Sequence, residues 1–429
     1  MSATHDPYVA VRSPLVRAYA IGRAAAVLGM QVTSVAVGWE LYERTGNAWA
    51  LGLVGLIELV PVLALMFVAG NAADRLPRRN LMMAAHTTLA VAVAGLAVIS
   101  VVRAPVAAIY ACLLFIGVGR AFSAPAGGTI VPQLVPAAQL ANANAWLSTS
   151  YELAAITGPA LGGALIALSG AATWAYALGT VAQLAFVGAL TRLPALRPRP
   201  PAAHHDSGEL FAGIAFLRRN PVFLAAITLD LFAVLLGGAV ALLPIFAKDV
   251  LHAGPVALGM LRAAPAVGAM AMALAATRLP PWRSPGKVLL LVVAGFGIAT
   301  IGFGLSRTLW LSLLCLLATG AFDTVSVVIR ATLEQVITPD PLRGRVSAIN
   351  FVFVGFSNEL GAFESGSTAA LFGPVASVVG GGIGALFVVG LVALRWPQLA
   401  AIGPLHTLAP ADAGPIVERA VAEGGRVGD

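Results

Sequence analysis

Long apolar segments alternate with short polar segments along almost the whole chain. Most of the apolar segments reach the ~20 residues that a helix needs to cross a hydrocarbon core of ~30 Å. They are continuous and rich in Leu, Ala and Val, whereas the strands of a membrane barrel are short and alternate between polar and apolar residues. The pattern therefore predicts an all-α membrane protein with twelve transmembrane helices, over residues 18–42, 48–69, 81–102, 106–125, 144–168, 171–191, 222–247, 255–277, 287–305, 309–330, 346–370 and 375–395.

The second half of the chain repeats features of the first half. The sequence Ala-Ala-Asp-Arg-Leu-Pro at residues 72–77 returns 203 positions later as Ala-Ala-Thr-Arg-Leu-Pro, with Thr277 in place of Asp74. A shared offset across half the chain indicates two similar membrane halves in tandem, an arrangement typical of transporters. Further pairs at offsets of 203 and 204 are Cys112 with Cys315, Gly117 with Gly320, Gly158 with Gly361, Gly55 with Gly259 and Pro61 with Pro265.

Composition and charge support this interpretation and add a topology. The chain is 59% hydrophobic and only 10% charged, against roughly 25% charged residues in a soluble domain. With the N-terminus inside, 20 of the 26 Lys and Arg residues fall on the inner side and 5 on the outer side. The positive-inside rule then predicts a multi-pass protein of the inner membrane with both termini in the cytoplasm. This topology accounts for the net charge of +7 without a nucleic-acid partner.

A polar, Pro-rich stretch over residues 194–206 separates the two halves and predicts an extended linker. Residues 208–220 carry apolar side chains at helical spacing, which predicts a short amphipathic helix on the inner membrane surface. The predicted parts are a cytoplasmic N-terminus (1–17), an N-terminal six-helix bundle (18–191), a linker with the amphipathic helix (192–221), a C-terminal six-helix bundle (222–395) and a cytoplasmic tail (396–429).

Several chemistries find no support in the sequence. Cys112 and Cys315 fall inside predicted helices and are interpreted as packing residues, not as a disulfide. The pair His204-His205 lies in the polar linker without acidic or Cys partners at metal-ligand spacing, so no metal site is predicted. No phosphate-binding Gly-x4-Gly-Lys loop and no nucleophile–base cluster is present. We therefore expect neither an enzyme nor a bound cofactor.

Two Gly-rich motifs stand out within this pattern. Residues 70–79 read Gly-Asn-Ala-Ala-Asp-Arg-Leu-Pro-Arg-Arg and join the second and third predicted helices. Its acid could cap the positive end of a helix, and its arginines could pair with acidic groups or lipid headgroups. In the fifth helix, Gly158, Gly162 and Gly163 allow a neighbouring backbone to come close, and Pro159 bends the helix.

With a third motif, Asn358-Glu-Leu-Gly-Ala-Phe-Glu-Ser-Gly366, these segments resemble the major facilitator superfamily, in its drug-exporter branch of enterobactin and macrolide exporters. The resemblance covers about residues 15–400 and implies two pseudo-symmetric six-helix bundles. Helix 4 departs from the pattern, because Leu113 and Phe115 stand where many drug exporters have Arg four residues before a Gly, and Arg120 lies nearer the inner end.

The resemblance also implies roles for the motif residues. The loop would latch the N-terminal bundle to the start of helix 11, about Arg345 to Ser347, and favour an outward-open state. The kinked surface of helix 5 would seal against the facing bundle. The residues assigned to latch and gating are Gly70, Asp74, Arg75, Arg78, Arg79, Gly158, Pro159, Gly162 and Gly163.

Ionisable residues inside a membrane are costly and are functional candidates by default. Each acid could carry a proton, hold a substrate or form a hydrogen-bonded structural contact, and an excess of acids favours a cationic substrate. In contrast, Glu40 and Glu43 lie by the outer end of helix 1 and are expected to be solvated. The candidates for proton or substrate binding are Glu359, Asp323, Glu364, Glu58, Glu152 and Asp230, with the uncharged Gln31, Asn350 and Asn358.

Together these features favour a secondary transporter. The leading hypothesis is proton-coupled efflux of a drug-like or siderophore-like molecule by alternating access of two bundles around a site near the midplane, with protons as the coupling ion. Uptake or facilitated diffusion of a nutrient is an alternative, and a non-transporting membrane sensor is a more distant one. A monomer is the expected state in the lipid bilayer.

Overall fold

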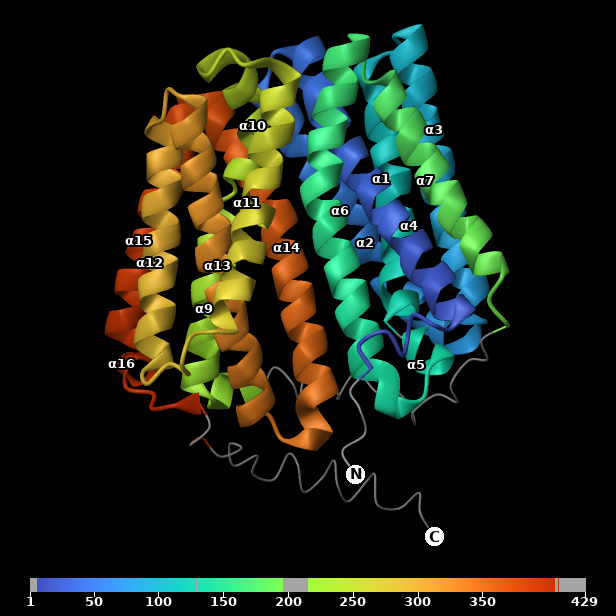
Figure 1. The fold of residues 1–429 in the computed structure, drawn as a ribbon. Coiled ribbons are helices and arrows are strands. Elements are labelled where there is room, and N and C mark those ends of the chain that lie inside the picture. The colour runs from blue at the N-terminus through green and yellow to red at the C-terminus, as the bar shows by residue number, and fades with distance from the viewer. Residues whose placement is uncertain (1–5, 129, 196–214, 406–407, 409–429) are drawn as a thin grey trace. The chain divides into compact units, whose positions relative to one another are not determined.

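The structure is a computed structural model that describes residues 6–128, 130–195, 215–405 and 408. Within these residues the regular elements are helices, most of them long and roughly aligned within each half of the chain (Figure 1). The helices are α1 (Pro14–Thr45), α2 (Ala48–Arg75), α3 (Arg78–Val102), α4 (Val106–Gly127), α5 (Val131–Leu134), α6 (Leu140–Ser169), α7 (Thr173–Thr191), α9 (Pro221–Leu236), α10 (Leu243–Ile245), α11 (Gly254–Ala276), α12 (Pro285–Leu305), α13 (Leu309–Ile337), α14 (Asp340–Phe372), α15 (Pro374–Arg395) and α16 (Pro397–Ala400).

The membrane-spanning character predicted from hydropathy is confirmed. Eleven helical segments of the described part are long and apolar enough to cross a membrane. The remaining predicted span, residues 346–370, lies within α14. The protein is therefore an all-helical, multi-pass membrane protein.

The seventh predicted span is broken, which its continuous apolar sequence did not reveal. α9 ends at Leu236 and is followed by a 3-10 turn (Ala239–Leu242), the short α10 and a π-helical turn (Phe246–Val250). The break begins at Gly237 and Gly238, where two adjacent glycines weaken the helix. A β carbon on Gly238 would stand 2.8 Å from the Gly361 carbonyl oxygen of α14, so the break also permits close packing.

Contacts divide the chain into two compact units. The first lies within Met1–Pro201 and Val240–Ala266, and the second within Ala202–Ala239 and Val267–Asp429. Residues 240–266, which belong to the C-terminal half of the sequence repeat, thus make their contacts with the first unit. The residues 196–214 of the predicted linker and most of the tail lie outside the described residues, and of the predicted amphipathic helix only 215–220 is described.

In the first unit α1 packs against α6 and α7, while α4 packs against α2 and α3. In the second unit α12 packs against α13 and α15, and α9 packs against α14 and α15. Cys112 and Cys315, which the offset of 203 residues pairs, each pack against a glycine of a neighbouring helix. The Sγ atom of Cys112 lies 3.0 Å from the position of a β carbon on Gly95, and Cys315 stands in the same relation to Gly302. Both cysteines are free, as expected for packing residues.

One expectation at the outer end of α1 is wrong. Glu40 is only 5% exposed and accepts a hydrogen bond from Arg44, one turn further along the helix. Arg44 also donates to the carbonyl oxygen of Ala104, at 2.9 Å, beyond the end of α3. The ion pair offsets part of the cost of burying the carboxylate, so Glu40 is part of the packing between these helices. Glu43 is exposed, as expected.

Candidate functional site

Asp230 of α9 and Arg330 of α13 form a buried ion pair inside the second unit. The Asp230 Oδ2 atom lies 2.6 Å from the Arg330 Nη1 atom, and the two side chains are 9% and 8% exposed. The Arg330 Nε atom also donates to the Ser326 Oγ atom at 3.3 Å. Burying a charge in a membrane protein costs desolvation free energy. A charge buried to this degree is therefore expected to have either a structural partner or a function.

A second acid stands beside this pair. Asp323 lies three residues before Ser326 and seven before Arg330, so helical periodicity places all three on one face of α13. Asp230, Asp323 and Ser326 line a very small cavity of about 10 Å³, whose other walls are apolar. Asp323 itself is exposed. The cavity therefore brings a second carboxylate next to a buried carboxylate–guanidinium pair, an arrangement suited to exchange of a proton.

This cluster combines residues that the sequence presented separately. Asp230 and Asp323 were predicted as separate intramembrane acids on the seventh and tenth spans, which correspond to α9 and α13. The structure brings both side chains to one cavity. Arg330 was not among the predicted site residues. Its spacing of seven residues from Asp323 was the signal that could have linked it to the acid.

In the first unit Glu58 of α2 forms an ion pair with Arg120 of α4. The Glu58 Oε2 atom lies 2.5 Å from the Arg120 Nη1 atom, and the side chains are 16% and 43% exposed. Gly117 makes this approach possible, because a β carbon there would stand 2.5 Å from the carbonyl oxygen of Glu58. Glu58 is thus paired with an arginine. Arg120 is a functional candidate that was not among the predicted site residues.

A further acid, Glu334, was missed altogether. It is 8% exposed near the end of α13 and accepts hydrogen bonds from Ser347 Oγ and, at 2.9 Å, from Asn350 Nδ2, both on α14. Asn350, predicted as a substrate ligand, therefore has an amide engaged in a helix–helix contact. Glu334 ties the first turns of α14 to α13.

The other predicted polar residues do not gather at one point within their units. On α14, Asn358 is exposed and donates to the carbonyl oxygen of Val354, Glu359 is half-buried, and Glu364 accepts a bond of 3.4 Å from Ser365 Oγ. On α6, Glu152 is half-buried. On α1, Gln31 packs against Gly158, whose β carbon would stand 2.6 Å from that of Gln31.

The predicted latch segment spans the end of α2 and the start of α3. Gly70 and Asp74 lie in the last turns of α2, Arg75 is its final residue, and Arg78 begins α3. Asp74 is therefore at the negative end of a helix, not at the positive end that an acidic cap would favour. Arg79 donates to the Leu193 carbonyl oxygen at 2.8 Å.

The glycines of α6 contact two helices of the first unit. Gly158 and Gly162 face α1, where a β carbon on Gly162 would stand 3.1 Å from the carbonyl oxygen of Val32. Gly163 faces α11: its β carbon would approach the Pro255 carbonyl oxygen and stand 3.1 Å from the Cα atom of Gly259. The first turns of α11 thus pack on α6 through two facing glycines, Gly163 and Gly259.

Substitution of Gly163 by Leu is expected to disrupt this contact. The added side chain would meet backbone atoms of α11 that cannot rotate away, and overpacking of this kind costs typically 1–3 kcal/mol. We expect a lower Tm in detergent and reduced transport. Gly188→Leu on α7 is the matched control, because no atom lies within 4 Å of its β-carbon position. Equal Tm values for the two variants would show that the glycine contact contributes little.

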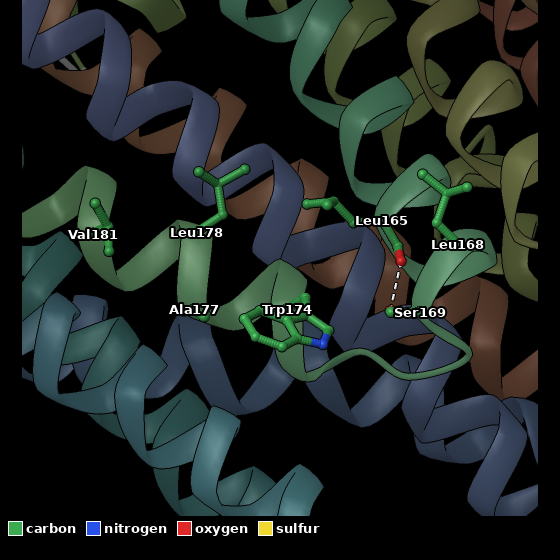
Figure 2. Close-up of a pocket in the computed structure, with 7 residues that line it drawn as sticks. All are labelled: Leu165, Leu168, Ser169, Trp174, Ala177, Leu178 and Val181. Atoms are coloured by element: carbon green, nitrogen blue, oxygen red, sulfur yellow. Dashed lines mark hydrogen bonds between the residues drawn. The ribbon is translucent and has the colours of Figure 1, made fainter.

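Figure 2 shows an apolar groove between α6 and α7, lined by seven residues of these helices. Its polar side chain, Ser169, donates to the Leu165 carbonyl oxygen at 2.6 Å (Figure 2). Leu168 and Trp174 are 87% and 64% exposed, as expected for side chains that face lipid. The groove holds no charged residue, so we do not assign it to transport.

Comparisons with known proteins agree with this architecture. Residues 5–421 match the family described as transmembrane secretion effector. The chain is 28% identical over 380 residues to an enterobactin exporter of Citrobacter koseri, covering 88% of this chain and 91% of that protein. An enterobactin exporter of Escherichia coli O81 is 28% identical over 382 residues, with 89% and 91% covered.

Solved structures share the fold. A bacterial homolog of the human lysosomal transporter Spinster, inward-facing and occupied, aligns with a TM-score of 0.72 at 15% identity over 92% of this chain and 99% of that one. A bacterial homologue of the iron transporter ferroportin, inward-facing, aligns with a TM-score of 0.69 at 16% identity over 90% of this chain and 99% of that one.

Proposed function

The chain belongs to the transmembrane secretion effector family of the major facilitator superfamily, and on this premise we propose that it exports a drug-like or siderophore-like small molecule in exchange for protons. The direction is supported by the relatives, which are named enterobactin exporters. The arginine distribution supports a multi-pass orientation in the inner membrane with both termini in the cytoplasm. A monomer is sufficient for this mechanism.

The observation that carries the proton coupling is the Asp230–Arg330–Asp323 cluster. Asp323 lines the same small cavity as Asp230 and can pass a proton to it, while Asp230 is held beside the Arg330 guanidinium. Protonation of Asp230 removes its negative charge and weakens the ion pair, which frees Arg330 and α9 to rearrange. Deprotonation restores the pair. The cluster thus supplies an element with two arrangements whose balance depends on proton binding.

This element can drive alternating access if the two arrangements differ in their affinity for substrate. A proton bound from the outer side would favour release of substrate outward, and loss of the proton inward would reset the transporter. The exchange needs only a difference in binding free energy between states, because equal affinity would shift no equilibrium. Asp230 lies on α9, and the break at Gly237 and Gly238 that follows this helix is the part of the second unit best suited to move, since helix breaks absorb changes in backbone angles.

The test is efflux from proteoliposomes loaded with fluorescent cations or with siderophores, with and without an imposed pH gradient. We expect export that accelerates when the receiving side is acidic, together with proton movement in the opposite direction. Movement at the same rate with no gradient would indicate a facilitator and contradict proton exchange. Accumulation against a gradient in the inward direction would indicate uptake.

A further inference from the structure

We infer that Arg120 of α4, held by Glu58 of α2, is the group through which the first unit recognises an oxyanion, such as a carboxylate, on the transported molecule. The inference rests on the proposed transport function and adds a substrate class to it. It assigns a binding role to a residue that departs from the helix 4 pattern of many drug exporters.

The backbone packing of α2 and α4 fixes where this pair lies. Gly117 of α4 is level with Glu58, because a β carbon on Gly117 would stand 2.5 Å from the Glu58 carbonyl oxygen and 3.1 Å from the Pro61 ring. Arg120 comes almost one turn later, nearer the end of α4 at Gly127. Its side chain therefore runs back along the helix to reach Glu58, away from the nearer helix end.

Helical side chains lean toward the N-terminus of their helix, and the pairing with Glu58 holds the Arg120 guanidinium within the membrane-spanning region. An arginine facing lipid extends toward the nearer interface to hydrate its charge. Arg120 reaches toward the middle of the span instead and is still 43% exposed. Exposure of a charge at this depth is compatible with a solvated transport pathway and is costly against lipid.

The chemistry of the pair suits competition by an anionic ligand. A guanidinium has five N–H donors in a planar fork and binds carboxylate-type oxygens with two parallel hydrogen bonds. Ion pairs with an exposed member are weak, because water screens them. A substrate carboxylate can therefore share or replace Glu58 as the partner of Arg120 at small cost, while Glu58 keeps the guanidinium in place when no substrate is bound.

The sequence repeat shows that the Glu58–Arg120 pair is particular to the first half of the chain. The offset of 204 pairs Glu58 with Arg262, and the offset of 203 pairs Arg120 with Asp323. These positions therefore carry charges of opposite sign to Glu58 and Arg120, and Arg262 donates to the Ser34 Oγ atom at 2.7 Å. Two of the six predicted acids, Glu58 and Asp230, are in ion pairs with arginine, which removes much of the argument for a purely cationic substrate.

The experiment measures binding of two xanthene dyes of opposite charge to the full-length protein in nanodiscs by fluorescence anisotropy. Carboxyfluorescein supplies the carboxylate, and tetramethylrhodamine methyl ester is the cationic counterpart. We expect Arg120→Gln to weaken carboxyfluorescein binding by about tenfold or more, as for loss of hydrogen bonds to a charged group, with little change for the cation. Glu58→Gln removes the competitor of the dye and is expected to tighten carboxyfluorescein binding by up to about fivefold.

A charge exchange distinguishes recognition from packing. The double variant Glu58→Arg with Arg120→Glu restores the ion pair and is expected to keep the wild-type Tm, yet to lose carboxyfluorescein binding. Arg307→Gln, an exposed arginine between α12 and α13, controls for net charge. If the double variant fails to fold, the two single variants still test the inference. Arg120→Gln is expected to raise the Kd for carboxyfluorescein, and Glu58→Gln is expected to lower it.

Three results would overturn the inference: no binding of carboxyfluorescein by the wild type, equal losses for both dyes in Arg120→Gln, or wild-type carboxyfluorescein binding by the exchanged protein. Failure of the proposed function has a different signature. In that case carboxyfluorescein binds and depends on Arg120, but no dye is moved across proteoliposomes in either direction.

Discussion

Substitution of Asp230 by Asn is expected to abolish proton-driven export and to lower the stability of the second unit. Arg330 would keep its charge with a side chain only 8% exposed, but without the carboxylate that lies 2.6 Å away. Removal of one partner from a buried pair costs about 3–5 kcal/mol. The change is close to isosteric, so the loss reports on charge. The measurements are Tm in detergent and pH-gradient-driven efflux in proteoliposomes.

A double variant separates the two expected losses. Asp230→Asn combined with Arg330→Gln removes both charges, and we expect it to regain most of the lost stability, because uncharged groups carry a much smaller desolvation penalty. Export should remain independent of the pH gradient, since no proton site is restored. Glu43→Gln, at an exposed acid of α1, is the matched acid-to-amide control. Gradient-driven export by Asp230→Asn at the wild-type rate would remove the cluster from the coupling mechanism.

Substitution of Asp74 by Asn is expected to abolish transport without loss of stability. Asp74 lies in the last turn of α2, at the negative end of the helix dipole, where an acid is unfavourable by typically 0.3–1 kcal/mol. Its removal should therefore leave Tm unchanged or slightly raised. A position that opposes local helix stability is the kind of site at which a functional role is expected, and here the family resemblance assigns a latch. Export assays and Tm measured on the same preparation make the comparison.

The predicted combination, normal or higher Tm with no export, is specific to a functional acid. A lower Tm would instead show that Asp74 stabilises the junction of α2 and α3. Normal export by the variant would eliminate the latch. Thr277→Asp places an acid at the repeat-equivalent position after α11. We expect no rescue of Asp74→Asn by this change, because the family resemblance implies a latch with the acid in the first half only.

Hydropathy alone was sufficient to locate the membrane-spanning segments. Each span must satisfy its backbone internally and present apolar side chains to lipid, so the information is local and is written in continuous segments of about 20 residues. The internal repeat is equally visible in the sequence, at the shared offsets of 203 and 204 residues. The family resemblance rested on three short motifs, at residues 70–79, 158–163 and 358–366, which can be recognised from the order of their residues alone.

The sequence by itself therefore determined the helical membrane architecture, the tandem repeat and the set of intramembrane acids. Only the tertiary structure decided which charges meet, because Glu58 and Arg120 are 62 residues apart, and Asp230 and Arg330 are 100 residues apart. It also decided that Glu40 is buried with Arg44 and that the seventh predicted span breaks at Gly237, after α9. It placed Asp74 at the C-terminal end of α2, where an acid does not cap the positive end of a helix. The physical reason is that hydrophobic burial in lipid is an additive property of each segment, whereas the state of a charge depends on partners that distant segments bring within a few ångströms.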